Sequence, residues 1–217
     1  MFRVVVYAEG PGELSGSRSL QPAPGTPLTE EELGSAHLLV RRCLEKTRGL
    51  TADSVHFEEP LRTSRGRLAR GSLLHSRDTL RPLLFWAGPI KPPDLAIVLV
   101  DADGDDERQG LLDSAIEGVP VEAIVAVAIQ EFEAWLVADP DALKAVLRQT
   151  LSLPRPPEKL SRRDAKEILK RWCEQHARSR DEAEIRRDLA RQCDLDTVAQ
   201  KCTAFASFLR KLQAPRS

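Results

Sequence analysis

Three continuous aliphatic runs constrain the fold of this chain more than any other feature of the sequence. They are RVVVYA at 3–8, LAIVLV at 95–100 and EAIVAVAI at 122–129. Strands have this composition when helices cover both faces of their sheet, as in the parallel sheets of α/β proteins. A fourth strand is expected at 53–58 (DSVHFE), and helical stretches separate the four strands. The chain is therefore predicted to be an α/β protein with a parallel sheet flanked by helices.

The residues after about 138 carry only helical patterns. Two parts are therefore expected: an α/β core over 1–138 and a helical extension over 139–217 that packs on this core. Asp139 before Pro140 predicts a helix start, and Ser161 with Asp164 predicts a capping box. The tail is expected to form one helix face packed on the core, because its apolar residues recur at spacings of three and four. These residues are Leu195, Val198, Cys202, Phe205, Leu209 and Leu212.

A helix starting near residue 30 is also predicted. Thr29 and Glu32 have the spacing of a capping box, and Leu28 with Leu33 has the spacing of a hydrophobic staple.

The composition bears on the class of protein and on its compartment. The 217 residues include 32 Lys and Arg against 33 Asp and Glu, so any basic surface must be local. No apolar run reaches the roughly 20 residues of a membrane span, and the N-terminus lacks a signal-peptide pattern. We therefore expect a cytoplasmic protein with no membrane partner. Its cysteines are expected as reduced thiols in the core, and their spacing does not favour a zinc site with His176. They are Cys43, Cys173, Cys193 and Cys202.

Carboxylates follow three of the four predicted strands. Glu9 follows the first strand, Asp101 and Asp103 the third, and Glu131 and Glu133 the fourth. The carboxyl ends of parallel strands meet at one edge of a sheet, where ligands bind. Asp101 and Asp103 point the same way if the segment is extended, so both could reach one ion. Because oxygen ligands suit Mg²⁺ or Mn²⁺, and a cation relieves their repulsion, a divalent metal site is predicted.

The acidic segment DADGDDE has two other interpretations besides a Mg²⁺ or Mn²⁺ site. An EF-hand loop needs glycine at position six and glutamate at position twelve, whereas Gly104 is fourth and Leu112 is twelfth. That interpretation is rejected. Asp105 and Asp106 could instead stabilise the N-terminus of the following helix through its dipole, and this interpretation stays open.

Five segments in a fixed order resemble a known family: VYAEGPGE, SRGRL, VLVDADGDD, QEFEAWLVAD and PPEKLSRRDAK. A strand ending in Glu and a later strand ending in DxD resemble the Toprim domain of topoisomerases, primases and overcoming-lysogenization-defect nucleases. The ordered segments are similar to a prokaryotic Toprim-like family of unknown function found in anti-phage defence loci near ATPase genes. This resemblance spans most of the chain and implies a Toprim-like sheet with an appended C-terminal helical segment.

The resemblance implies roles for several of the carboxylates. It implies that Glu9 acts as general acid or base and that Asp101 and Asp103 hold Mg²⁺, which makes these three the expected catalytic residues. Glu133 matches a recurrent acid of the narrower family, which often has EGxTE where this chain has EGPGE. The expected metal ligands are Glu9, Asp101, Asp103, Asp105 and Glu133, with Glu131 as an alternative to Glu133.

Two basic segments could contact phosphates beside these acids. Residues 62–81 carry six Arg against one Asp, and residues 155–180 carry nine Lys or Arg against four acids. The second segment could equally be a helix with a solvated basic face. The expected nucleic-acid contacts lie in the first segment, at Arg62, Arg65, Arg67, Arg70 and Arg77.

The sequence thus predicts metal-dependent phosphodiester chemistry, as in a nuclease acting on DNA or RNA. The resemblance adds phage defence together with an ATPase of the same operon. Two alternatives stay open: a non-catalytic Toprim-like binding subunit of an ATPase complex, and recognition of a nucleotide through metal-bridged phosphates. A homo-oligomer is compatible with all three, and the sequence does not distinguish DNA from RNA.

Overall fold

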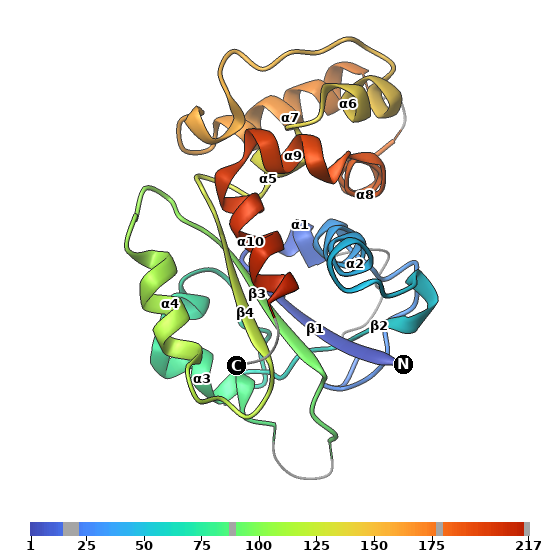
Figure 1. Ribbon diagram of the computed structural model, residues 1–217. Coiled ribbons are helices and arrows are strands. Elements are labelled where there is room, and N and C mark those ends of the chain that lie inside the picture. Colours follow the sequence, from blue (N-terminus) through green and yellow to red (C-terminus); the bar gives the residue numbers. More distant parts are fainter. Residues whose placement is uncertain (15–21, 87–89, 177–179, 215–217) are drawn as a thin grey trace.

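A parallel sheet of four strands forms the centre of the computed structural model (Figure 1). The structure describes residues 1–14, 22–86, 90–176 and 180–214. The strand order is β2-β1-β3-β4, and every neighbouring pair is parallel. Each predicted strand is confirmed to within two residues at either end. The strands are β1 Phe2–Ala8, β2 Val55–Glu58, β3 Leu95–Asp101 and β4 Ala123–Ala128.

Helices connect the strands and make up the part of the chain that follows β4. Those before β4 are α1 Pro11–Leu14, α2 Ser35–Arg48, α3 Arg77–Leu84 and α4 Arg108–Ile116, with short 3-10 helices η1 Ala52–Ser54 and η2 Gly71–Leu74. Those after β4 are α5 Glu133–Leu136, α6 Pro140–Leu147, η3 Pro157–Lys159, α7 Asp164–His176, α8 Glu182–Gln192, α9 Leu195–Lys201 and α10 Thr203–Gln213. No helix among the described residues has the length and apolar composition needed to span a membrane.

The two faces of the sheet are buried in separate cores, which explains the continuous apolar strands. Successive side chains of a strand point to opposite faces. Val4 and Val6 therefore join a core formed with α2, α8 and α10, whereas Val5 and Tyr7 join a core formed with α3 and α4. The prediction of a parallel sheet with helices on both faces is confirmed.

The helices after residue 138 contribute to the first of these cores. Leu189 of α8 and Phe205 of α10 are fully buried in it, and Trp135 lies edge-on to Phe205 with their ring centroids 5.1 Å apart. Figure 1 shows α6, α7, α8 and α9 gathered beyond the carboxyl ends of the strands, while α10 runs beside β4. The extension thus packs on the sheet and also covers the edge where the predicted carboxylates lie. The four cysteines are free and buried, as expected.

The helix predicted from residue 30 begins five residues later, at Ser35. Glu32 accepts hydrogen bonds from the Thr29 backbone N–H and hydroxyl, at 2.8 and 3.0 Å, but these bonds close a turn before the helix. The preceding backbone is held extended, because Leu28 N–H donates to the Phe57 carbonyl beside β2 at 2.8 Å. The α2 N-terminus is instead closed by His37, whose Nδ1 accepts from the Gly34 N–H at 3.1 Å.

The single helix predicted for the tail is wrong, because α9 and α10 are separated at Cys202. The backbone of Cys202 is extended, with φ −127° and ψ 102°. The Glu158 carboxylate accepts from Thr203 N–H and hydroxyl, both at 2.7 Å, and from Ala204 N–H at 2.9 Å. These N–H donors are the unpaired groups of a helix start, so a side chain from a distant segment stabilises the new N-terminus.

Candidate carboxylate site

Glu9 joins three segments at the carboxyl end of the sheet. It directly follows β1, and its Oε2 accepts from the Asp101 backbone N–H at 2.9 Å. The same oxygen lies 3.0 Å from His75 Nε2. The Glu9 carbonyl also accepts from Gly71 N–H at 3.1 Å, so the segment 71–75 is attached to the end of β1. The predicted meeting of the first and third strand ends at this edge is confirmed for Glu9 and Asp101.

Asp101 is the last residue of β3, and its side chain faces the end of β4. Its Oδ1 accepts from the Phe132 backbone N–H at 2.8 Å. Burial raises the pKa of Asp101 to about 9, and the neighbouring carboxylates of Glu13, Glu133 and Glu9 act in the same direction. This rise favours the protonated form of Asp101 as long as no cation is bound.

Glu13 and Glu133 lie close to Asp101, and the buried guanidinium group of Arg186 pairs with Glu133. Glu13 is in α1 and Glu133 begins α5, and these residues are 4% and 2% exposed. Burial and the Glu133 charge raise the pKa of Glu13 to about 8. Arg186 of α8 pairs with Glu133, with Nη1 2.6 Å from Oε1, and also with Glu182 at 2.6 Å. The site thus holds four carboxylates, Glu9, Glu13, Asp101 and Glu133, and receives its buried positive charge from the helical extension.

The expectation of an extended segment from Asp101 to Asp103, with both side chains pointing the same way, is wrong. The strand ends at Asp101, and the backbone at Asp103 is left-handed with φ 52°. The alternation of side chains holds only in extended backbone. The Asp103 carboxylate pairs instead with Arg162, with Oδ1 2.9 Å from Nε.

Asp105 and Glu131 stabilise helix starts in this structure. Asp105 accepts from the Glu107 N–H at 3.1 Å and pairs with Arg108 at 3.4 Å, just before α4. This agrees with the helix-start interpretation of Asp105. Glu131 accepts from the Lys166 N–H at 3.0 Å in the first turn of α7. Its pKa is raised by burial, which outweighs the effect of that hydrogen bond.

The donor chemistry of the cluster fits a hard divalent cation, although its geometry is not that of a formed metal site. Within 1–14, 22–86, 90–176 and 180–214, no three Asp, Glu, His or Cys side chains are arranged to hold a metal ion. Burial is the main cause of the raised pKa values of Asp101 and Glu13, and repulsion between the carboxylates adds to it. For Glu13, the Arg186 charge offsets only part of the rise. A cation of the Mg²⁺ or Mn²⁺ type binds oxygen ligands and would compensate the remainder.

The first basic segment lies next to Glu9. Residues 62–68 form a hairpin in which Thr63 N–H donates to the Arg67 carbonyl at 2.8 Å. Arg65, Arg67 and Arg77 are exposed, whereas Arg70 is half-buried. Arg62 donates to the Pro22 carbonyl, so part of its donor capacity serves the fold. The segment is attached to the cluster through the contacts of Gly71 and His75 with Glu9.

The second basic segment lies next to Asp103 and Glu131. Arg162 pairs with Asp103, and the Lys166 N–H binds Glu131. The two basic segments are therefore each attached to a carboxylate that follows a strand, although they are far apart in the sequence.

Sequence reasoning missed three residues of the cluster. Glu13 closes the segment EGPGE and could have been included as a second acid after β1. His75 gives no signal in the sequence, because a lone histidine has no partner pattern. Arg186 lies in a helix rich in charges of both signs, and nothing in that pattern distinguishes it from surface arginines.

The comparisons with known proteins identify a family without a described activity. No curated protein and no solved structure matches the chain. A family model described as "Domain of unknown function (DUF4276)" matches residues 37–213. The matched region contains Asp101, Glu133 and Arg186, whereas Glu9 and Glu13 precede it. Because this match covers most of the sequence, the chain belongs to the DUF4276 family.

Proposed function

We propose that this protein carries out divalent-metal-dependent phosphodiester chemistry on DNA or RNA, most simply hydrolysis. The observation that supports it is the carboxylate cluster at the carboxyl end of the sheet, with a basic segment attached to Glu9. Glu9 and Asp101 meet at the carboxyl end of the sheet, where ligands of open α/β sheets bind. The segment attached to Glu9 carries the exposed arginines Arg65, Arg67 and Arg77, and Arg162 of the second basic segment pairs with Asp103, two residues after Asp101. Phosphodiester hydrolysis of this kind needs carboxylates that bind a metal ion and basic side chains that bind the phosphates of the substrate.

Roles for the residues follow from their positions. A bound Mg²⁺ or Mn²⁺ would stabilise negative charge on the reacting phosphate. Asp101 and Glu9 would hold the metal from the two strand ends, and Asp103 would join them once its pair with Arg162 opens. Glu133 lies near Asp101, whose pKa it raises, and is paired with Arg186. Glu9, hydrogen-bonded to His75, would accept or return a proton at its carboxylate.

The biological setting is proposed from the resemblance to Toprim-like proteins of defence loci. In that setting the protein acts in the cytoplasm in phage defence, together with an ATPase of the same operon. A homo-oligomer is compatible with this setting.

The proposal is tested by incubating purified protein with labelled single-stranded DNA, double-stranded DNA and RNA, with Mg²⁺ or Mn²⁺ and with EDTA. We expect metal-dependent cleavage that Glu9→Gln and Asp101→Asn each reduce by about 100-fold or more, because each removes a charge assigned to the metal or the proton. Asp53→Asn, an exposed acid on η1, is the matched control and should retain full activity.

Two outcomes would count against hydrolysis. Cleavage that persists in both variants would point to a contaminating nuclease. Metal-dependent binding without turnover, with and without the ATPase, would favour the alternative of a binding subunit.

A further inference from the structure

Arg70 carries a positive charge for which the described residues provide no partner. Its Nε is buried without an acceptor, as are the Nε atoms of Arg41, Arg62 and Arg187. Each of those three arginines nevertheless donates to a described oxygen through a terminal nitrogen. Arg70 makes no such bond within the part of the chain that the structure describes. Because buried charged donors are normally paired, the guanidinium group of Arg70 is available to an anion that the protein binds.

The backbone around Arg70 is fixed beside Glu9. The next residue, Gly71, donates its N–H to the Glu9 carbonyl at 3.1 Å. On the other side, Ala69 is fully buried in the core formed with α3 and α4, and so is Leu74. A side chain that extends from a backbone held on both sides is suited to binding a ligand in a defined position.

No acid cancels the charge of Arg70 among the described residues. In the second basic segment, Arg162 is paired with Asp103 at 2.9 Å. No comparable pair joins Arg70 to Glu9 or to another described carboxylate, and residues 60–77 contain no Asp or Glu. The positive charge of Arg70 therefore remains uncompensated next to the end of β1.

Exposure separates Arg70 from other arginines of its segment. Arg65, Arg67 and Arg77 are exposed, so water hydrates their charges, and each can neutralise a phosphate of a nucleic-acid backbone. Arg70 is half-buried and keeps less water around its guanidinium group. A charge in such surroundings gains more from a phosphate, and the planar guanidinium group can bind two phosphate oxygens at once.

We infer that Arg70 binds the phosphate of a nucleic-acid strand that lies at the metal held by Glu9 and Asp101. Arg70 and the metal then neutralise the same phosphate, while the exposed arginines of the hairpin bind phosphates further along the strand. Negative charge develops on the phosphate oxygens during the reaction, so Arg70 stabilises the transition state more than the bound substrate. The inference rests on the proposed phosphodiester chemistry and adds the residue that positions the phosphate.

The side-chain resonances of arginine test this contact without turnover. The full chain is prepared with isotope-labelled arginine, and the Nε–H signal of Arg70 is identified by its loss in Arg70→Lys. The probes are short DNA and RNA strands with Ca²⁺, which replaces Mg²⁺ so that the strands stay intact. The Arg70 signal should shift when a strand is added, and EDTA or Asp101→Asn should abolish the shift. Inorganic phosphate at the same concentration should shift the signal less, because the hairpin arginines do not help to hold it.

Substitutions test the contribution of Arg70 to turnover. Arg70→Met removes the charge and should lower kcat by about 100-fold while changing KM by less than about threefold. Arg70→Lys keeps a charge without the planar fork and should lower kcat by about 10-fold. Arg67→Met, from the exposed hairpin, should act mainly on KM. Arg210→Met, at an exposed position on α10, is the matched control and should behave as the wild type.

Thermal stability distinguishes a binding role from a structural one. Arg70→Met removes a donor that has no described acceptor. In the absence of metal and nucleic acid, this variant should therefore melt no lower than the wild type. A lower melting temperature would show that Arg70 stabilises the fold, and it would overturn the inference.

Two further results would overturn the inference. A shift of the Arg70 signal that persists in EDTA, or no shift with any strand, would show that Arg70 binds no phosphate at the metal. A wild-type kcat in Arg70→Met would show that the reaction does not use this side chain, although the proposed chemistry would stand. Conversely, if the wild type cleaves nothing but the Arg70 signal shifts only with Ca²⁺ present, hydrolysis is wrong and the phosphate contact at the metal is supported.

Discussion

Among single residues, Asp101 and Glu13 govern the state of the carboxylate site through their protonation. Their pKa values are raised to about 9 and about 8. Carboxyl groups of an unfolded chain titrate near about pH 4. Between these values the folded protein holds protons that the unfolded chain has released, so raising the pH lowers the stability of the fold. A bound divalent cation stabilises the folded protein at these pH values, because it takes the place of the protons on the carboxylates.

Asp101→Asn should separate these effects. Without divalent metal, the wild-type melting temperature should fall as the pH rises from about 5 to about 8, and the variant should show a shallower fall because residue 101 no longer titrates. Mn²⁺ at roughly a hundredfold excess over its dissociation constant should stabilise the wild type by about 2.7 kcal/mol, and the variant much less. Calorimetry measures both effects. Equal pH slopes in the variant, the wild type and the control Asp53→Asn would show that Asp101 is already ionised in the folded protein.

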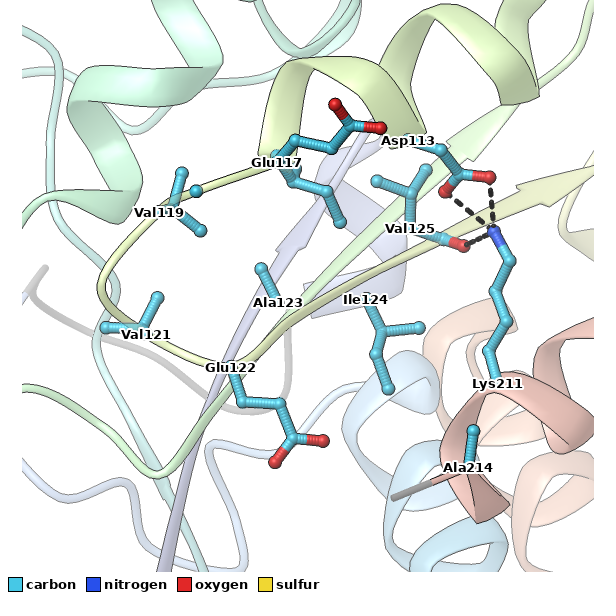
Figure 2. Close-up of a pocket in the computed structure, with 12 residues that line it drawn as sticks. Asp113, Glu117, Val119, Val121, Glu122, Ala123, Ile124, Val125, Lys211 and Ala214 are labelled. Atoms are coloured by element: carbon cyan, nitrogen blue, oxygen red, sulfur yellow. Dashed lines mark hydrogen bonds and ion pairs between the residues drawn. The ribbon is translucent and has the colours of Figure 1, made fainter. Parts of the chain in front are cut away.

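Among the helices and strands, the break between α9 and α10 shows a helix start stabilised from a distance. The residues around Cys202 have the sequence pattern of one continuous helix. The helix is interrupted where the Glu158 carboxylate accepts three hydrogen bonds from Thr203 and Ala204. The break changes the direction of the chain, so that α10 lies against β4 and α2 while α9 stays near the other extension helices (Figure 1). The hydrogen bond from Lys211 of α10 to the Val125 carbonyl of β4, at 3.1 Å, depends on this change of direction (Figure 2).

Glu158→Ala should therefore destabilise the protein by about 1 kcal/mol, the usual cost of removing a helix N-cap. Urea unfolding followed by circular dichroism measures the difference. Glu174→Ala, which removes an exposed acid from α7, is the control and should remain within about 0.5 kcal/mol of the wild type. A variant at Glu158 as stable as this control would mean that water replaces the cap at no cost.

Across the whole molecule, charge is distributed by region although the net charge is only −1. The segment 62–77 carries five arginines and is attached to Glu9 through Gly71 and His75, whereas Arg162 pairs with Asp103. The arginine-rich segment therefore favours phosphates as ligands near the carboxyl end of the sheet.

The double substitution Arg65→Ala and Arg67→Ala tests this expected contact with phosphates. Nucleic-acid affinity should fall, and the slope of log K against log salt should become shallower by about 0.7 to 0.9 for each phosphate that the protein no longer neutralises. Fluorescence anisotropy at several salt concentrations measures both. The pair Arg171→Ala and Lys144→Ala, at exposed positions on α7 and α6, is a charge-matched control. A slope unchanged from the wild type would show that the hairpin arginines only face solvent.

The sheet and part of the site could be predicted from the amino-acid pattern alone. The runs around Val5, Val98 and Val125 are almost entirely apolar. Only burial on both faces of a sheet suits such strands, so a parallel sheet could be predicted. Glu9 directly follows one of these runs and Asp101 another, and parallel strands place their carboxyl ends together. The proximity of these two residues was therefore also predictable.

The remaining features depend on contacts between residues distant in sequence, which no local pattern reveals. The left-handed backbone at Asp103 and its pair with Arg162 end the alternation expected for the DxD segment. Glu158 separates α9 from α10 although it lies 45 positions before Thr203. Arg186 enters the cluster from a helix whose pattern indicates only an amphipathic surface. Local patterns determine which residues are buried, whereas the partner of a buried charge depends on how distant elements pack.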